Sequence, residues 1–327
     1  MYPQDSIELH KTISMAKRTT TKEPQTIKEI TTIPDWFVEI QPELPPQLPK
    51  IASPFRMYRS DIGDNRYYYE MKEDGPAIPY ISVTSFISKQ TPMEEYLIKW
   101  QHDIGGLDQA NYVRDREACY GTLLNTLMIQ VLKDNGGDFT AFGEEAFQLA
   151  LSENYISQAS EWRRKIKNDI ACWVYFIQER NVKWVTAGFL VACPRRRVAG
   201  YLDGCFEMDF NKGRVNAIID FKKKNYPNSV KHDLQLQTYK ALWNDLYSDV
   251  FPVTHVFNWA PGNMNAVKKY DLVNRTDSVF AKSIGIRLEL PVLEGQIKAP
   301  AYYDEVNGEF TLDKEFDIKN YIQRFNF

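Results

Sequence analysis

Two aspartates and a lysine carry the strongest chemical pattern in this chain of 327 residues. Asp203 lies in the run Gly200-Tyr-Leu-Asp203, and Asp220 and Lys222 lie two residues apart in Ile218-Ile-Asp-Phe-Lys222. Carboxylates and an ammonium group on neighbouring strands can hold a divalent metal ion and a water beside a phosphate. The pattern therefore predicts cleavage of phosphodiester bonds in nucleic acid.

The residues before Asp220 favour a strand that ends at this chemistry. The run 215–219 is largely apolar and follows the turn residues Asn211-Lys-Gly213. Side chains alternate along a strand, so Asp220 and Lys222 are expected on one face. The same triplet recurs at Asp317-Ile-Lys319 without an apolar run before it. A charged strand end with a surface salt bridge is the alternative interpretation.

Each residue of the pattern has an expected role in hydrolysis. Asp203, Asp220 and the main-chain carbonyl of Phe221 would hold Mg²⁺ or Mn²⁺, because Mg²⁺ prefers oxygen ligands and keeps several waters. Lys222 would orient the attacking water and stabilise charge on the phosphate. Glu207 has the strand parity of Asp203, but a solvated strand carboxylate is the favoured interpretation for it.

A helix capped by 227–229 and ending near Tyr247 is expected to complete the site. Gln235 and Tyr239 are four residues apart, so they share a face of that helix. Tyr239 also belongs to an apolar stripe with Leu236, Trp243 and Leu246, which would pack on the sheet. A core aromatic with a satisfied hydroxyl is therefore the alternative interpretation of Tyr239.

These motifs together resemble the PD-(D/E)XK nuclease superfamily, in particular its RecB-like branch, over residues 80–260. The matching residues are Asp203, Asp220-Phe-Lys222 and Gln235-Leu-Gln-Thr-Tyr239. The segments Tyr80-Ile-Ser-Val-Thr84 and Tyr120-Gly-Thr-Leu-Leu-Asn125 are similar to motifs of the mitochondrial genome maintenance exonuclease group. The resemblance implies an α/β restriction-endonuclease-like core, with a mixed sheet flanked by helices. It also implies a metal-dependent single-strand DNA exonuclease in replication, recombination or repair.

The chain departs from the family pattern at two positions. Asn125 stands where the pattern has a histidine, and its amide oxygen would be a weaker metal ligand. No glutamate stands near Ala187 or Gly188, where many relatives carry one. These departures favour a second interpretation, a weakened nuclease fold that binds or scaffolds nucleic acid. No cysteine follows Cys205, so no iron–sulfur cluster is expected.

The charge balance limits how the chain can bind nucleic acid. The formal net charge is −3, so no basic field covers the whole protein. Two local clusters flank the acidic residues and are expected to bind phosphates: Arg195, Arg196 and Arg197, and Lys223 and Lys224. Tyr67, Tyr68, Tyr69 or Trp100 could stack on bases, although such aromatics are more often core residues.

The order of elements predicts four parts of the chain. Residues 1–52 form a Pro-, Thr- and Lys-rich arm, expected to be flexible and to dock a replication or recombination protein. Residues 53–182 are expected to form a β-hairpin and helices that lead into the core at 183–262, with a C-terminal extension at 263–327. No apolar run approaches the roughly 20 residues of a membrane helix. We expect no membrane association and a cytoplasmic location, or the host-cell cytoplasm if the protein is viral.

Overall fold

The computed structural model describes residues 51, 53–55, 57–62, 65–70, 77–91, 95–134, 136–279, 281, 284, 301–304 and 309–312. All of them belong to a compact unit that spans Gln41–Phe327. Apart from Ile51, the predicted arm lies outside the described residues, and so does the second Asp-x-Lys triplet at Asp317.

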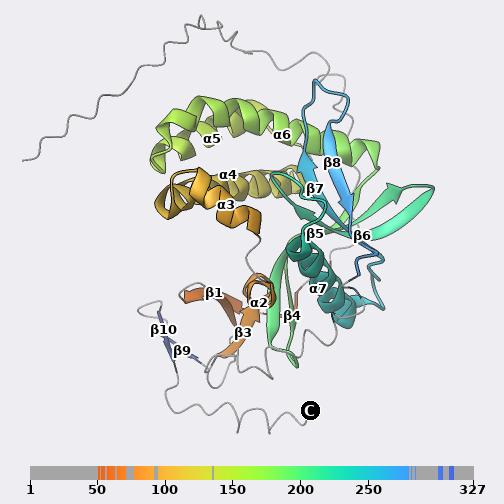
Figure 1. Ribbon diagram of the computed structural model, residues 1–327. Coiled ribbons are helices and arrows are strands. Elements are labelled where there is room, and N and C mark those ends of the chain that lie inside the picture. Colours follow the sequence, from red (N-terminus) through yellow and green to blue (C-terminus); the bar gives the residue numbers. More distant parts are fainter. Residues whose placement is uncertain are drawn as a thin grey trace, which may run out of the picture. The chain divides into compact units, whose positions relative to one another are not determined.

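The described elements come in blocks along the chain, with strands, then helices, then strands, then α7 and further strands, close to the order expected from the sequence (Figure 1). The strands are β1 (Met57–Ile62), β2 (Asn65–Glu70), β3 (Ile78–Ser82), β4 (Lys183–Cys193), β5 (Val198–Phe210), β6 (Gly213–Phe221), β7 (His255–Pro261), β8 (Tyr270–Asn274), β9 (Ala301–Asp304) and β10 (Glu309–Leu312). The helices are α2 (Val83–Gln90), α3 (Glu95–Asp103), α4 (Leu107–Lys133), α5 (Phe139–Ser152), the short 3₁₀ turn Ile156–Gln158, α6 (Ala159–Glu179) and α7 (Val230–Tyr247).

Eight strands form one mixed sheet, which confirms the predicted α/β class with helices on both faces. The order is β1-β2-β3-β5-β6-β7-β8, and β4 pairs with β5. The β3–β5 and β6–β7 pairs are parallel, and the other pairs are antiparallel. β9 and β10 form a separate two-stranded sheet.

β5 shares one of its edges between two neighbours. Its residues Val198 and Ala199 pair with both β4 and β3, whereas Gly204 to Glu207 pair with both β4 and β6. A strand has only two edges, so β3 and β6 must lie on the same one. Residues 200–203 therefore face a gap between β3 and β6, and we call this the β5 gap.

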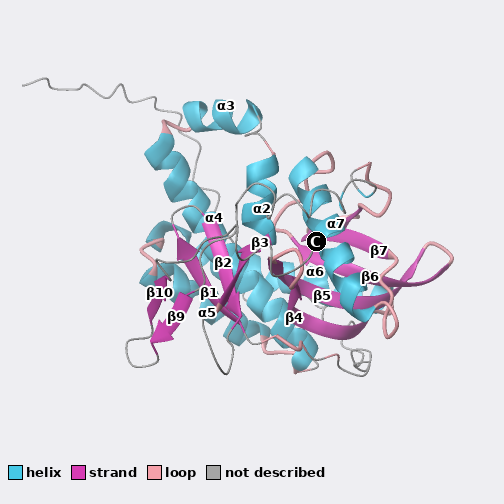
Figure 2. Ribbon diagram, turned by 90° about the horizontal axis from the view of Figure 1, so that it is seen from below, coloured by secondary structure: helices cyan, strands magenta, loops and turns pink. Residues whose placement is uncertain are grey.

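Helices cover the two faces of the sheet near this gap (Figures 1 and 2). On one face α7 packs with α2, and the Trp243 ring lies 5.4 Å from that of Phe189 on β4. On the other face Trp173 of α6 contacts the rings of Phe206 and Phe221 at 6.0 and 4.8 Å. Large buried aromatics thus fix both helices to the sheet.

Two local features refine the sequence prediction. β3 ends at Ser82, inside the segment Tyr80–Thr84, because the Ser82 hydroxyl accepts the N–H of Ser85 at 3.0 Å and caps α2. β8 and the buried Arg275 belong to the predicted C-terminal extension, yet β8 pairs with β7 along its whole length. Part of that extension therefore completes the sheet.

Candidate active site

Asp203 and Asp220 converge at the β5 gap. Asp203 is the last residue of β5 before the pairing with β6 begins, and Asp220 lies next to the end of β6. The N–H of Phe221 donates to Asp203 Oδ2 at 2.6 Å, so the side chain of one strand binds the main chain of the other. The two predicted carboxylates thus meet where the sheet opens.

Asp203 is held from two directions. Its Oδ2 accepts from Phe221, and its Oδ1 accepts from the Asn125 amide on α4 at 2.7 Å. Burial and the charge of Asp220 raise the pKa of Asp203, against the opposing effects of Lys222 and these two hydrogen bonds. Two carboxylates this close repel each other, and a divalent cation between them would relieve that repulsion.

Lys222 connects Asp220 to α7. Its Nζ lies 2.7 Å from Asp220 Oδ2 and donates to Gln235 Oε1 at 3.1 Å. Asp220 is only 5% exposed, so this ammonium group compensates much of the cost of burying the carboxylate. The predicted shared face of Asp220 and Lys222 agrees with this geometry.

A buried network behind Asp220 was missed by sequence reasoning. Asn258, paired with Asp220 between β6 and β7, donates its amide to Asp220 Oδ2 at 2.6 Å. Arg275 donates its Nε to Asn258 Oδ1 and its Nη1 to Asp233 Oδ1 at 2.5 Å. Its other donors bind the carbonyls of Tyr226 and Pro227, at 2.7 and 3.1 Å. An asparagine inside the apolar run 256–260 was the only local signal.

Tyr239 is placed as a support of the site rather than at its surface. It is 3% exposed, and its hydroxyl donates to the Tyr201 carbonyl at 3.0 Å. Its ring lies against Gly200, where a Cβ would come within 2.6 Å of the ring carbon Cε1. This packing needs glycine at position 200 and holds the strand segment that carries Asp203.

The ligand types around Asp203 fit a hard divalent cation. Asn125 Oδ1 is buried and has no hydrogen-bond partner among the described residues, while its Nδ2 is bound to Asp203. A buried acceptor without a donor costs about 1–3 kcal/mol, which a cation would offset. No group of three or more His, Cys, Asp or Glu in the described part of the chain is arranged to hold a metal. Amide and carbonyl oxygens would have to complete the set.

Gly188 occupies the position opposite Asp203 on β4, between the pairs Ala187–Gly204 and Phe189–Leu202. Its φ is +63°, a conformation that glycine adopts without strain. A Cβ at this position would come within 2.8 Å of Tyr201 Oη, so the glycine leaves room for that side chain.

The predicted basic residues do not gather at one place. Arg195, Arg196 and Arg197 form the β4–β5 turn, where Arg196 pairs with Asp245 at 2.6 Å and Arg197 is buried. About 20 Å of strand separates this turn from Asp203, at about 3.3 Å per residue.

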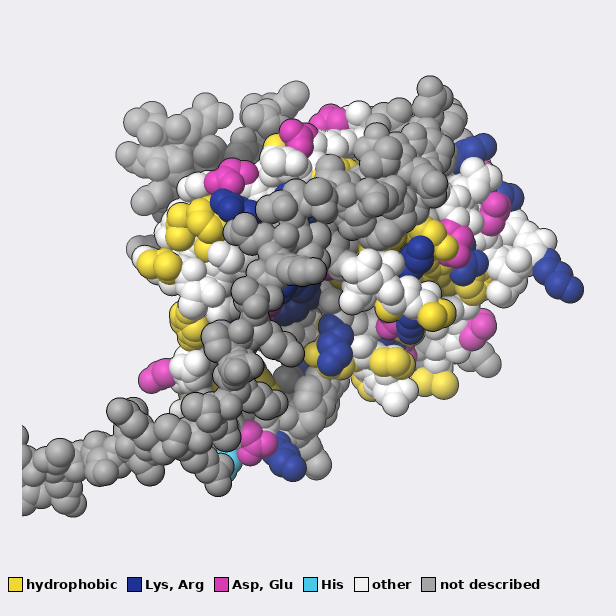
Figure 3. Space-filling model, turned by 90° about the horizontal axis from the view of Figure 1, so that it is seen from above, with side chains coloured by type: hydrophobic (Ala, Val, Ile, Leu, Met, Phe, Trp, Pro, Cys, Tyr) yellow, Lys and Arg dark blue, Asp and Glu magenta, His cyan; other side chains and the backbone are white. Residues whose placement is uncertain are grey.

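Lys223 and Lys224 lie much closer to the carboxylates, because they follow Lys222 directly. Lys223 forms an ion pair with Glu117 on α4, and Lys224 lies 5.6 Å from the centre of the Tyr226 ring. On the face shown in Figure 3, acidic side chains are interspersed among the Lys and Arg side chains. Of the predicted basic residues, Lys223 and Lys224 are therefore the ones that lie near the carboxylates in the chain.

The predicted stacking residues are mostly core residues. Tyr67 and Tyr69 are 0% exposed and Tyr68 is 8% exposed, and Trp100 is half-buried. Glu207 binds Arg214, with its Oε1 2.9 Å from Arg214 Nε, and does not contact Asp203. These side chains therefore form no part of the cluster at the β5 gap.

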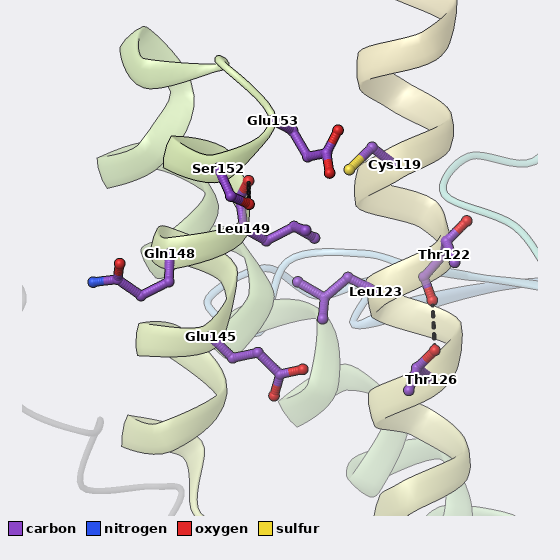
Figure 4. A pocket seen from close by; sticks show the side chains of 9 residues that line it. All are labelled: Cys119, Thr122, Leu123, Thr126, Glu145, Gln148, Leu149, Ser152 and Glu153. Atoms are coloured by element: carbon purple, nitrogen blue, oxygen red, sulfur yellow. Dashed lines mark hydrogen bonds between the residues drawn. The ribbon is translucent and has the colours of Figure 1, made fainter.

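An open cavity of about 740 Å³ lies elsewhere, between α4 and α5 (Figure 4). Glu145 and Glu153 project into it, and Glu153 lies beside Cys119, whose thiol pKa is raised by burial and by that carboxylate. Carboxylates on the rim would repel a phosphate. None of the predicted site residues lines this cavity.

The site has two sides that differ in how far their groups are enclosed. On the buried side Asp220, Asn258 and Arg275 are buried, and Lys222 and Gln235 are half-buried. On the open side Tyr201 and Lys223 are exposed, and Asn125, Asp203 and Glu117 are half-buried.

No protein-family model matches the chain, and no curated protein matches it either. None of the described helices is both long enough and apolar enough to cross a bilayer.

Proposed function

We propose that this protein is a metal-dependent nuclease that hydrolyses phosphodiester bonds at the β5 gap. The observation that carries the proposal is the convergence of Asp203 and Asp220 beside a lysine fixed on both sides. Lys222 Nζ is held by Asp220 at 2.7 Å and by Gln235 at 3.1 Å. Hydrolysis of a phosphodiester bond is helped by a metal ion held by such oxygens and by a cation positioned beside the phosphate.

Asp203, Asp220, Asn125 Oδ1 and the carbonyl of Phe221 would hold the ion. When bound, Mg²⁺ or Mn²⁺ supplies a more acidic water and neutralises charge on the phosphoryl oxygens. The chain's own contribution is orientation, because Asn258 and Lys222 both bind Asp220 Oδ2 and leave its other oxygen for the site. Lys222 would bind the attacking water or stabilise the charge that builds on the phosphate.

DNA is the proposed substrate, attacked from a single-stranded end. The support for this finer statement is the resemblance to RecB-like exonucleases in Asp203, Asp220-Phe-Lys222 and the Gln235–Tyr239 helix. Two lysines next to Lys222 would bind the backbone. A process in replication, recombination or repair would supply such ends.

The test is digestion of end-labelled single- and double-stranded DNA with Mg²⁺, with Mn²⁺ and with EDTA. Asp220→Asn and Lys222→Met should each lower cleavage by about 10²- to 10⁴-fold. Lys268→Met is the matched control, because Lys268 pairs with Asp271 at 2.5 Å on the surface and should leave cleavage unchanged. Circular dichroism would verify that each variant is folded. A wild-type protein that cuts no DNA with either metal would refute the proposal.

A weakened nuclease fold that binds nucleic acid is the second candidate. It is favoured by one contact, the Asn125 amide that donates to Asp203 Oδ1, where a histidine could instead act as a metal ligand. DNA binding that survives EDTA, with no cleavage at any metal concentration, would support this second function. Asn125→His should then raise the affinity for Mn²⁺, and an unchanged affinity would count against it.

The predicted arm is the proposed docking segment for a replication or recombination protein. Deletion of residues 1–52 should leave cleavage intact and remove the complex with that partner. Loss of cleavage in the deletion variant would instead assign the arm to the nuclease itself.

A further inference from the structure

Tyr201 is an exposed aromatic residue in immediate reach of the candidate site. Its side chain is 54% exposed, whereas the predicted stacking residues Tyr67 and Tyr69 are fully buried. Tyr201 precedes Asp203 by two residues on β5, and the burial pattern alternates between them, so both side chains lie on one face. Two residues of strand place them about 7 Å apart.

The main chain of Tyr201 is anchored from the opposite face of the sheet. Its carbonyl accepts the Tyr239 hydroxyl at 3.0 Å, and the Tyr239 ring packs closely on Gly200. These contacts use only the backbone of Tyr201. The exposed ring therefore projects from a rigid strand and remains available for contact.

Gly188 makes room for the Tyr201 side chain. A Cβ at position 188 would come within 2.8 Å of Tyr201 Oη and 3.2 Å of Ile129 Cδ1 on α4. The ring thus extends across β4 toward α4, along the side of the site that carries Asn125 and Asp203. Many members of the family that this chain resembles carry a glutamate near this position. Here the glycine leaves space for an aromatic ring.

The exposed ring of Tyr201 offers a face that can stack on any base, because every base has a π-face.

We propose that Tyr201 stacks on a nucleobase next to the phosphate held at Asp203 and Asp220, and thereby selects single-stranded nucleic acid. This inference rests on the proposed nuclease function and names the residue that would give it a preference for single strands. In a duplex both faces of an internal base are already stacked on its neighbours. The base must therefore leave the duplex stack before it can stack on the Tyr201 ring. A single-stranded end offers that face at lower cost.

The first test measures binding of a short phosphorothioate oligothymidylate with Mg²⁺ by fluorescence anisotropy. Tyr201→Ala should weaken binding by about 5- to 140-fold, and Tyr201→Phe should keep most of the affinity. Tyr112→Ala is the matched control, because Tyr112 is 43% exposed on α4 and lies 13 residues before Asn125. Equal losses in Tyr201→Ala and Tyr112→Ala, or in Tyr201→Ala and Tyr201→Phe, would overturn the proposal.

A double-mutant cycle identifies the base that Tyr201 contacts. The same oligonucleotide is made with one abasic residue at each position in turn and bound to wild type and Tyr201→Ala. At one position the two losses should not add, because both remove the same stack. Additive losses at every position would overturn the inference. Cleavage of unmodified DNA by the wild type is measured alongside, so a failure of the nuclease proposal is recognised separately.

Discussion

The buried side and the open side of the site differ in how far their polar groups have hydrogen-bond partners among the described residues. On the buried side, Asp220 is surrounded by donors that are themselves held, with Asn258 bound in turn by Arg275, whose side chain is 1% exposed. On the open side, Asn125 has a buried acceptor without a partner among the described residues. Apart from the second oxygen of Asp220, the groups of the buried side bind one another, whereas the open side has an unused acceptor for a ligand.

This difference has a physical consequence for how the two sides respond to change. A buried polar network loses much stability when one member is removed, because the remaining groups stay desolvated. A partly exposed group can form hydrogen bonds with water instead. Substitutions on the buried side should therefore lower stability and metal affinity, and substitutions on the open side should lower substrate binding.

Arg275→Met should show the largest effect of this kind. It leaves Asp233, Asn258 Oδ1 and the carbonyls of Tyr226 and Pro227 without their donor, so unfolding free energy should fall by about 3–5 kcal/mol. Because Asn258 would no longer be fixed against Asp220, Mn²⁺ affinity should also fall about 10- to 100-fold. Urea unfolding and Mn²⁺ titration measure the two effects.

Arg214→Met is the control for that experiment. Arg214 also binds two carboxylates, Glu207 and Asp209, but its side chain is 32% exposed and lies on the β5–β6 hairpin away from Asp220. Surface pairs of this kind contribute about 0–1 kcal/mol. If the two arginine variants lost equal stability, the contrast between the sides would be wrong.

Two glycines test the packing that supports the site. A Cβ at Gly200 would lie 2.6 Å from the Tyr239 ring and 2.8 Å from Val83 Cγ2, so Gly200→Ala should destabilise the fold by about 1–3 kcal/mol. At Gly121 on α4, a Cβ would have no heavy atom of the described residues within 4 Å. Gly121→Ala should therefore stabilise the protein by about 0.5–1 kcal/mol. Thermal unfolding distinguishes these signs, and two losses of similar size would contradict the packing.

The sequence was most informative where local pattern and chemistry coincide. The apolar run 215–219 predicted β6, and alternation along it predicted that Asp220 and Lys222 share a face. The polar residues 227–229 predicted the cap at which α7 begins, and the spacing of four residues predicted that Gln235 and Tyr239 share a face of that helix. These properties depend on period and capping, which neighbouring residues determine.

Contacts between distant segments could not be predicted in this way. Arg275 is connected to Asp220 through Asn258, although the two residues are 55 positions apart in the sequence. The pairing of β8 with β7 brings Arg275 to this place, and no local pattern predicts that pairing. Nothing local shows which face of a strand another element covers, so the sequence alone leaves the tyrosines of β2 as candidates for stacking. Tyr67 and Tyr69 are completely buried because they pack in the core with residues such as Phe86 and Leu234.

His232 gives a pH test of the buried side, because the charges of Lys222 and Arg275 act on its imidazole. Burial lowers the pKa of His232 to about 3, and the charges of Lys222 and Arg275 act in the same direction. Between pH 3 and about 6.5 the unfolded chain then binds the proton and the folded chain does not. This group should therefore lower stability as the pH falls below about 6.5, by about 1.4 kcal/mol per pH unit.

His232→Phe keeps a ring beside Tyr226, 6.3 Å away in the wild type, and removes the titration. Urea unfolding from pH 7 to 4 should therefore show a shallower loss of stability in His232→Phe than in wild type. His255→Phe is the comparison on β7, where burial and Lys240 lower the pKa but the charge of Asp277 opposes them. Its slope should change less, because that opposition has no counterpart at His232. If the unfolding free energy had the same pH dependence in wild type and His232→Phe, His232 would be protonated in the folded protein as readily as in the unfolded chain. The buried side would then be more accessible to solvent than its hydrogen bonds indicate.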